Sequence, residues 1–415
     1  MTYQTIDRLE NGVYTASGCD TNRLVNSESH FSFSASSSGG IPEIMATLGP
    51  TLEKPEDIKR AIEAGAYWFR CPCGYRQRPH LENARTVRAA SAEVGVPVRL
   101  LLDLPSSRPR TGKMEELRLT IGDRVRFWDP EGSDLNPARN CVFLVPVPGL
   151  AHLIPKLAPG QHMWFCDGRL SFVLEALEQT SALARLDYGT IPLKSSNALF
   201  LPDSPSPFVV LTPDDRALLK TFAAASIIPD WVALSLIASP DDVRAGRHEA
   251  GDLLGQAVRM MAKFETQAAL ACAEEILEVS DGIMVARGDL GLAVGYTRLP
   301  EAQDRLVGAA RRAGKVSVVA TQVLEVFSET GVPQRAELSD LSLIARQGAS
   351  AVMLGKETVF SPRPIECIRF AREVLTYETR RFEAAQEPKA LRVRQSPKAE
   401  GRVGSMVKNL PNGPH

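Results

Sequence analysis

Eight short apolar runs alternate with longer amphipathic stretches along most of this chain, and that rhythm limits the folds it can adopt. Each run has strand length and is rich in β-branched or aliphatic residues, whereas the stretches between them have helical periodicity. Parallel strands that are covered by helices are apolar almost throughout. The pattern therefore predicts an α/β fold, a parallel (β/α)8 barrel, with strands at 43–47, 67–71, 99–103, 231–236, 259–264, 282–287, 316–321 and 351–356. Helices are expected at 55–64, 81–94, 240–247, 267–279, 302–313 and 337–347.

One long segment breaks this rhythm between the third and fourth predicted strands. Residues 113–212 carry short runs with period-2 patterning, such as HMWFCD and RLSFVLEAL, between Gly, Pro and Asp turns. We expect a small β-barrel-like lid domain here, inserted after strand 3, where it would cover the mouth of the barrel. The barrel is then expected in two parts, 41–112 and 213–386, between an N-terminal segment 1–40 and a basic tail 387–415 whose compositions predict mobility.

The charge balance argues against several classes of partner. Of the 415 residues, 48 are Lys or Arg and 49 are Asp or Glu, so no overall positive field recruits nucleic acid or an acidic membrane. The chain has no uninterrupted apolar run of about 18 residues, the length needed to span a bilayer.

The seven cysteines are scattered without a CxxC pair, and no signal-like leader follows Met1. This pattern indicates reduced thiols and a cytoplasmic location. Cys71-Pro72-Cys73 is interpreted as structural, because no second pair would complete a zinc site.

Polar side chains gather where the predicted strands stop, which is where barrels of this type carry their reactive groups. Glu265 and Asp289 follow adjacent strands, so their carboxylates can converge as the hard oxygen ligands that Mg2+ or Mn2+ prefers. Lys263 would share the face of Glu265 and could neutralise an oxyanion on a substrate. A structural ion network at the barrel rim would give a similar set. The full set of strand-end positions is Thr47, Arg70, Asp103, Ser235, Lys263, Glu265, Arg287, Asp289, Thr321, Gln322 and Glu357.

A glycine-containing turn is expected at Ala286-Arg287-Gly288-Asp289, and its backbone amides could bind a carboxylate. The run SDGIMVARGDLG around it, with MAKFET, VVATQVLE, PQRAELSD and VMLGKET, resembles the pyruvate kinase family. The runs IMATLGPTLEKPEDIKRAIEAGAYWFR and LLDLPSSRPRTG agree with this resemblance, which is colinear from about residue 41 to residue 385. It implies a barrel with a lid, in a diverged member that lacks the family's C-terminal regulatory domain.

The resemblance also implies roles for individual residues. Glu265 and Asp289 match ligands of Mg2+ or Mn2+, and Lys263 matches the cation that stabilises the transferring phosphoryl group and the enolate of pyruvate. Thr321 matches a residue near the proton transfer at the methyl carbon, and Arg70 matches a phosphate-contacting arginine. The implied substrate-binding positions are Ala286, Arg287, Gly288, Asp289, Asp103 and Arg110.

Other positions depart from the family pattern. Pro72 and Gly74 offer K+ no side-chain oxygen, although the fixed charge of Arg108 could replace that ion, as a lysine does in potassium-independent relatives. Asn197 replaces a lysine that would face the nucleotide phosphates, which weakens charge stabilisation there. Tyr75 replaces a nucleotide-side histidine, Ala238 an arginine, and Gly355-Lys356-Glu357 a Ser-Gly-Glu run. The requirement for K+ and the binding of a nucleotide are therefore left open.

The residues that match the family are those implied to hold the enolpyruvate skeleton, whereas those implied to face the nucleotide and K+ differ, and three functions are compatible with this difference. The first is a Mg2+-dependent enzyme that acts on pyruvate, phosphoenolpyruvate or a related 2-oxoacid through a metal-stabilised enolate. Such an enzyme would have diverged from ATP formation towards aldolase or lyase chemistry. The first alternative is a genuine short pyruvate kinase that converts phosphoenolpyruvate and ADP to pyruvate and ATP. The second is a non-catalytic relative that binds phosphoenolpyruvate. In each case we expect a cytoplasmic homo-oligomer that binds neither nucleic acid nor membrane.

Overall fold

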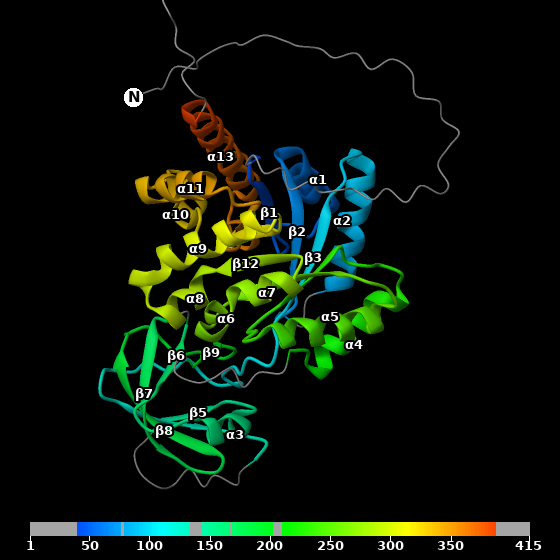
Figure 1. The fold of residues 1–415 in the computed structure, drawn as a ribbon. Helices are drawn as coiled ribbons and strands as arrows, with labels where there is room; N and C mark the ends of the chain where they lie inside the picture. The colour runs from blue at the N-terminus through cyan, green and yellow to red at the C-terminus, as the bar shows by residue number, and fades with distance from the viewer. Residues whose placement is uncertain (1–39, 76–78, 133–142, 167, 202–209, 387–415) are drawn as a thin grey trace, which may run out of the picture. The chain divides into compact units, whose positions relative to one another are not determined.

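Eight parallel strands close into a barrel in the order β1-β14-β13-β12-β11-β10-β3-β2 (Figure 1). The structure is a computed structural model that describes residues 40–75, 79–132, 143–166, 168–201 and 210–386. The predicted TIM-type (β/α)8 barrel is confirmed, and β1 and β11 have the predicted bounds. The barrel strands are β1 (Glu43–Thr47), β2 (Ala66–Pro72), β3 (Arg99–Leu104), β10 (Trp231–Leu234), β11 (Arg259–Phe264), β12 (Gly282–Ala286), β13 (Val316–Ala320) and β14 (Ala351–Leu354).

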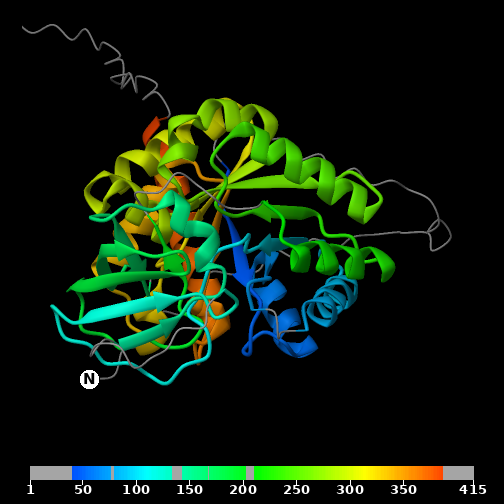
Figure 2. The same cartoon turned by 90° about the horizontal axis from the view of Figure 1, so that it is seen from below.

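Helices connect the barrel strands and pack against their outer side, as the turned view shows (Figure 2). They are α1 (Pro55–Ala64), α2 (His80–Val94), α4 (Pro213–Ala224), α5 (Pro240–Leu254), α6 (Gln267–Ala271), α7 (Ala273–Val279), α8 (Arg287–Val294), α9 (Leu299–Arg312), α10 (Glu325–Thr330), α11 (Arg335–Gln347), α12 (Lys356–Val359) and α13 (Pro364–Gln386), with a 3-10 turn at Tyr296–Arg298. The single helix predicted at 267–279 is wrong, because Cys272, at φ −114° and ψ 41°, separates α6 from α7. The turn predicted from Ala286 is also wrong, since α8 begins at Arg287.

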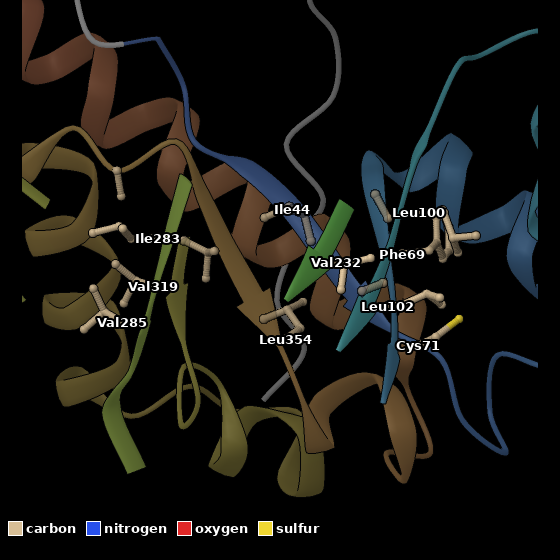
Figure 3. Packing of buried hydrophobic residues seen from close by; sticks show 14 of the residues in the cluster. Ile44, Phe69, Cys71, Leu100, Leu102, Val232, Ile283, Val285, Val319 and Leu354 are labelled. Carbon is tan, nitrogen blue, oxygen red and sulfur yellow. The ribbon is translucent and has the colours of Figure 1, made fainter. Parts of the chain in front are cut away.

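Side chains alternate between two apolar cores along each barrel strand. Ile44 and Val232 belong to the core between the barrel and its helices, which Figure 3 shows from close by. Their neighbours Met45 and Ala233 belong to a second core, inside the barrel. This alternation follows from the two-residue period of a strand and fixes which later residues of each strand face inward.

The segment between β3 and α4 forms a separate six-stranded sheet in the order β5-β4-β8-β7-β6-β9. Its elements are β4 (Arg124–Trp128), β5 (Phe143–Pro146), α3 (Leu150–Leu153), a 3-10 turn at Ile154–Lys156, β6 (His162–Phe165), β7 (Leu170–Leu177), β8 (Ser181–Tyr188) and β9 (Leu199–Phe200). Phe127 stacks on Phe165 and meets Phe172 edge-on, with ring centroids 5.2 and 5.1 Å apart, in a core of its own. The predicted β lid inserted after strand 3 is therefore confirmed.

Two predictions about the ends of the chain lie almost wholly outside the described residues, because residues 1–39 and 387–415 are not described. Among the helices that are described, none combines the length and the apolar character needed to cross a bilayer.

Candidate active site

Polar side chains occupy inward-facing positions where the barrel strands end. On β11, Met261 fills the barrel interior, so Lys263, two residues later, lies on the same side of the strand. On β3, the same spacing leads from Leu101 to Asp103. The strand period thus carries the apolar interior of the barrel into a charged layer at its carboxyl end.

Lys263 is the centre of this charged layer. Its Nζ lies 3.0 Å from Oδ1 of Asp103 and 3.0 Å from Oε1 of Glu265, and it donates a hydrogen bond of 2.7 Å to Oγ of Ser235. Arg70 donates from Nε to the other carboxylate oxygen of Asp103 at 2.6 Å. One polar network therefore joins the ends of β2, β3, β10 and β11, and the expected proximity of Lys263 and Glu265 is observed.

The charges in this network shift one another's proton affinities. Burial disfavours the ionised form of Asp103, but the charges of Lys263 and Arg70 outweigh it and hold the pKa of Asp103 below its ordinary value. Burial also opposes the charge on Lys263, yet Asp103 and Glu265 together raise the pKa of that lysine. At Glu265, burial raises the pKa despite Lys263, and the negative charge of Asp289 adds to the effect. Burial is therefore the main reason that Glu265 holds its proton more tightly than an exposed glutamate does.

Glu265 and Asp289 face a shared cationic neighbour. Nη1 of Arg108 donates a hydrogen bond of 3.0 Å to Oδ1 of Asp289, and its Nη2 lies 3.9 Å from Oε2 of Glu265. The same Oε2 accepts a hydrogen bond of 2.7 Å from the backbone N–H of Leu236. Leu236 has a φ of +56°, and β10 ends two residues earlier than the sequence predicts. The turn after β10 thus supports the Glu265 carboxylate.

The donor set at these two carboxylates fits a hard divalent cation. Mg2+ in proteins is commonly held by one or two carboxylates, with water and substrate oxygens as further ligands. Within the described ranges, no group of three or more His, Cys, Asp or Glu side chains could enclose a metal ion. As hard oxygen donors, Glu265 and Asp289 suit Mg2+ or Mn2+ better than a structural Zn2+ site, which is usually built from cysteine and histidine.

The start of α8 is tied to the end of β13. The backbone N–H of Gly288 donates to Oγ1 of Thr321 at 3.1 Å. Arg287 turns its guanidinium to both carboxylate oxygens of Asp340, at 2.6 and 2.7 Å, and to the carbonyl oxygen of Thr321. The Arg287 side chain thus holds the end of β13 and does not line the cavity, so a contact of this residue with a substrate would come from its backbone.

The turn after β13 has an unusual backbone. Thr321 and Gln322 have φ values of +74° and +53°, a left-handed conformation that residues with side chains seldom adopt. Buried Glu357 stabilises this turn, since its Oε1 accepts hydrogen bonds of 3.0 Å from the two backbone N–H groups that follow Gln322. Its Oε2 accepts from the N–H of Gly355 at 2.7 Å. Glu357 thereby fixes the Thr321 side chain beside α8.

A cavity of about 230 Å3 lies over this charged layer. Eleven residues predicted from the strand ends or from the resemblance line this cavity, namely Thr47, Arg70, Asp103, Lys263, Glu265, Ala286, Gly288, Asp289, Thr321, Gln322 and Glu357. Four departures from the family pattern line it too, namely Pro72, Tyr75, Gly355 and Lys356. The side chains of Glu325, Val359 and Phe360 complete the wall and were not predicted, although their short distance in sequence from β13 and β14 is a signal that could have found them.

A second, larger cavity of about 1040 Å3 lies between the lid and the residues that follow β2 and β3. Its four cationic lining residues are Arg108, Arg110, Arg169 and Lys194. Arg110, which the resemblance implies as a substrate-binding residue, donates to the carbonyl oxygen of Ser196 at 3.0 Å and lines this cavity, not the one over Lys263. Tyr75 lines both cavities.

Comparison with known proteins gives one consistent result. Residues 41–368 match the family model of the pyruvate kinase barrel domain. The chain belongs to the pyruvate kinase family. It is 34% identical to a pyruvate kinase of Methylorubrum extorquens over 331 residues, which are 79% of this chain and 66% of that protein. It is 31% identical over 342 residues to one of Agrobacterium vitis, covering 80% and 67% of the two chains. The chain thus spans about two thirds of the length of these relatives.

The departures from the pyruvate kinase pattern occupy definite places in the structure. Asn197, which stands where the family pattern has a lysine, accepts a hydrogen bond of 2.7 Å on Oδ1 from the backbone N–H of Lys194. Lys194 itself pairs with Glu116 at 2.9 Å and lines the larger cavity. The side chain of Asn197 is therefore used in a hydrogen bond to the backbone of its own loop, while Lys194 of the same loop places a cation at the larger cavity.

Proposed function

We propose that this chain transfers a phosphoryl group between phosphoenolpyruvate and a nucleoside diphosphate, with Mg2+ or Mn2+ as the cofactor. The observation that carries the proposal is that Tyr75 lines both the cavity over Lys263 and the cationic cavity under the lid. The smaller cavity suits a three-carbon acid, and the larger one, with its four cations, suits a polyphosphate. Direct transfer requires two such sites to adjoin. The pyruvate kinases among the relatives support the same reaction.

Each charged or polar group of the site has its own role in this phosphoryl transfer. Arg70 holds the phosphoryl group, and Lys263 neutralises the enol oxygen as the bond from that oxygen to phosphorus breaks. A new bond forms from phosphorus to the terminal oxygen of the diphosphate. A proton from solvent then adds to the methylene carbon of the enolate beside Thr321, and that carbon becomes the methyl group of pyruvate. The backbone amides at the start of α8 bind the carboxylate of the acid.

Glu265 and Asp289 are the residues that would hold the divalent cation. When bound, such an ion neutralises charge on phosphoryl and enolate oxygens. The pKa of Glu265 is raised by burial and then by the charge of Asp289, and a divalent cation between the two carboxylates would relieve both effects.

Aldolase or lyase chemistry is the second candidate, and one observation favours it. Asn197 bonds to its own loop, so the charge that the family pattern directs at the nucleotide phosphates from this position is missing. A metal-stabilised enolate can also attack an aldehyde, and the smaller cavity would serve both reactions equally. The two candidates therefore differ in what occupies the larger cavity.

Two nuclear magnetic resonance experiments separate these candidates. Phosphorus spectra of the protein with phosphoenolpyruvate, ADP and Mg2+ should show the γ-phosphate of ATP. Proton spectra of pyruvate with Mg2+ in D2O should show loss of the methyl signal by exchange. Lys263→Met should reduce both rates by about 100-fold or more, because it removes the charge that stabilises the enolate. Lys59→Met, which breaks the surface ion pair of Lys59 with Glu93, is the matched control and should keep both rates.

Each result has a definite meaning. Methyl exchange without ATP formation would refute the phosphotransferase and favour the aldolase or lyase. Loss of both reactions in a folded protein that still binds phosphoenolpyruvate would leave the non-catalytic relative.

A further inference from the structure

The four cations that line the larger cavity differ in what their charged ends contact. A terminal nitrogen of Arg108, one of Arg110 and the ammonium of Lys194 each contact an oxygen atom of another residue. Arg169 uses its Nε instead, which donates a hydrogen bond of 3.1 Å to the carbonyl oxygen of Cys166. Within the described ranges, neither Nη1 nor Nη2 of Arg169 has a partner. Arg169 therefore brings to this cavity two terminal nitrogens that a ligand can use.

The turn that carries Arg169 has a tightly constrained backbone. It joins β6 to β7 in the lid, and the Cys166 carbonyl oxygen accepts from the backbone N–H of Arg169 at 3.2 Å as well as from its Nε. On the other side, Gly189 approaches the Arg169 carbonyl oxygen so closely that a Cβ on this glycine would overlap it. The backbone and the side chain of Arg169 are thus both held in place, so a ligand that binds to it has little further freedom to remove.

The same turn rests on the barrel. A Cβ on Gly168, whose φ is +80°, would overlap Cδ2 of Leu292 on α8 and would lie 3.2 Å from the hydroxyl oxygen of Tyr296. In Figure 1 this end of the lid lies directly below α8. In the proposed function, the first backbone amides of α8 bind the carboxylate of the acid. The lid turn therefore holds Arg169 at the larger cavity while it packs against the helix that binds the other substrate.

We propose that Arg169 binds the diphosphate of the nucleotide from the lid side of the larger cavity, through Nη1 and Nη2. A guanidinium can bind phosphate oxygens through two parallel N–H···O bonds, and these two nitrogens supply the donors. Arg169 thereby provides a charge that is missing at Asn197, where the family pattern has a lysine. The inference rests on the proposed function, which places a nucleoside diphosphate in this cavity, and it assigns recognition of the phosphates and not of the base to Arg169.

Calorimetry with Mg2+ tests this role by measuring the dissociation constants of ADP, pyrophosphate and phosphoenolpyruvate. Arg169→Met should weaken the binding of ADP and of pyrophosphate by the same factor of about tenfold, the effect of one charge-assisted contact at an exposed site. The dissociation constant of phosphoenolpyruvate should not change, because Arg169 does not line the smaller cavity. Arg169→Lys keeps the charge without the pair of nitrogens and should weaken both phosphate ligands by only about threefold.

Arg124→Met is the matched control. It removes a different arginine of the lid, on β4, whose Nε pairs with Glu175 at 2.9 Å and which lines neither cavity, so all three dissociation constants should stay as in the wild type. Unchanged binding of ADP in Arg169→Met would overturn the inference. An equal loss of phosphoenolpyruvate affinity would also overturn it, since it indicates a structural role. A loss for ADP but not for pyrophosphate would place Arg169 at the nucleoside and would overturn it as well.

The same preparations separate this inference from the proposed function. ATP formation from phosphoenolpyruvate and ADP, with an ADP affinity that does not depend on Arg169, defeats the inference alone. Binding of ADP and pyrophosphate that depends on Arg169, without ATP formation, defeats the phosphotransferase alone. A wild type that binds phosphoenolpyruvate but not ADP defeats both.

Discussion

Arg108 and Asp289 lie 181 positions apart in the sequence, yet Nη1 of Arg108 donates a hydrogen bond of 3.0 Å to Oδ1 of Asp289. Arg108 belongs to the segment that leads from β3 to the lid, and its guanidinium also lies 6.0 Å from the ring centroid of Phe200 on β9. One side chain therefore connects the root of the lid with a carboxylate proposed to hold the divalent cation.

Replacing Arg108 should strengthen the binding of a divalent cation. The guanidinium occupies one oxygen of Asp289 and places a positive charge close to Glu265, and both effects oppose a second cation. We expect Arg108→Met to bind Mn2+ about fivefold more tightly, measured by electron paramagnetic resonance of free Mn2+. Arg244→Met, which removes an exposed arginine of α5, should leave the affinity unchanged. Weaker Mn2+ binding in Arg108→Met would show that the arginine supports the cation instead of competing with it.

Lys263 should contribute to stability as well as to chemistry. Lys263→Met leaves the carboxylates of Asp103 and Glu265 buried without their shared cation, and loss of one partner from a buried pair costs about 3 kcal/mol of unfolding free energy. Urea unfolding followed by circular dichroism measures this change. In the double variant Lys263→Met/Glu265→Gln, about 1 kcal/mol or more should return, because the buried Glu265 charge, whose remaining cation Arg108 lies 3.9 Å away, is gone. Equal stability of the single variant and the wild type would contradict the network described here.

The sequence predicted most of the barrel because a strand repeats every two residues. That period places Lys263 and Asp103 on the inner side from the apolar residues before them, with no knowledge of the tertiary structure. It also predicted that Glu265 would lie beside Lys263, since Glu265 comes two residues later and so lies on the same face of the strand end.

The contacts of Arg108 and Arg287 could not be predicted in the same way. Arg108 lies in a connecting segment without periodicity, so nothing in its neighbourhood indicates a partner 181 residues later. The α8 helix was missed because two glycines among its eight residues give a weak helical signal. Without knowledge that α8 begins at Arg287, the sequence near this residue does not indicate that its side chain points towards Asp340 on α11.

Arg287 should act on the reaction through Thr321. Arg287→Met frees the carbonyl oxygen of Thr321 and leaves Asp340 without its bidentate partner. We expect methyl exchange of pyruvate to slow by about tenfold while the dissociation constant of pyruvate changes by less than about twofold, because the altered geometry affects proton transfer and not binding. Exchange spectra and calorimetry measure the two quantities.

A double-mutant cycle tests whether Arg287 and Asp340 act together. Asp340→Asn should slow exchange in the same direction, and the double variant should be little worse than Arg287→Met, since both changes disrupt one pair. Asp241→Asn, at an exposed ion pair of α5, should have no effect. A loss of pyruvate affinity with normal exchange in the bound state would instead place Arg287 in contact with the substrate.

Cys71 should make the stability of the protein fall in alkaline solution. Burial raises the pKa of the Cys71 thiol from 9.0 to about 12. Above pH 9 the unfolded chain loses this proton while the folded chain keeps it, so the unfolded state is favoured progressively as the pH rises towards 12. One thiol contributes about 1.4 kcal/mol per pH unit within this window and nothing below it.

The difference in unfolding free energy between the wild type and Cys71→Ala isolates this contribution, because all other titrating groups are common to both chains. That difference should be constant up to about pH 8.5 and should then decrease by about 1.4 kcal/mol between pH 9.5 and 10.5, measured by urea unfolding. The same comparison with Cys272→Ala should give a smaller decrease, since Cys272 is only partly buried and burial raises its pKa less strongly. If the Cys71 difference stayed constant up to pH 10.5, the thiol would have to ionise in the folded barrel as readily as in the unfolded chain, which the complete burial of Cys71 in the core between the barrel and its helices does not allow.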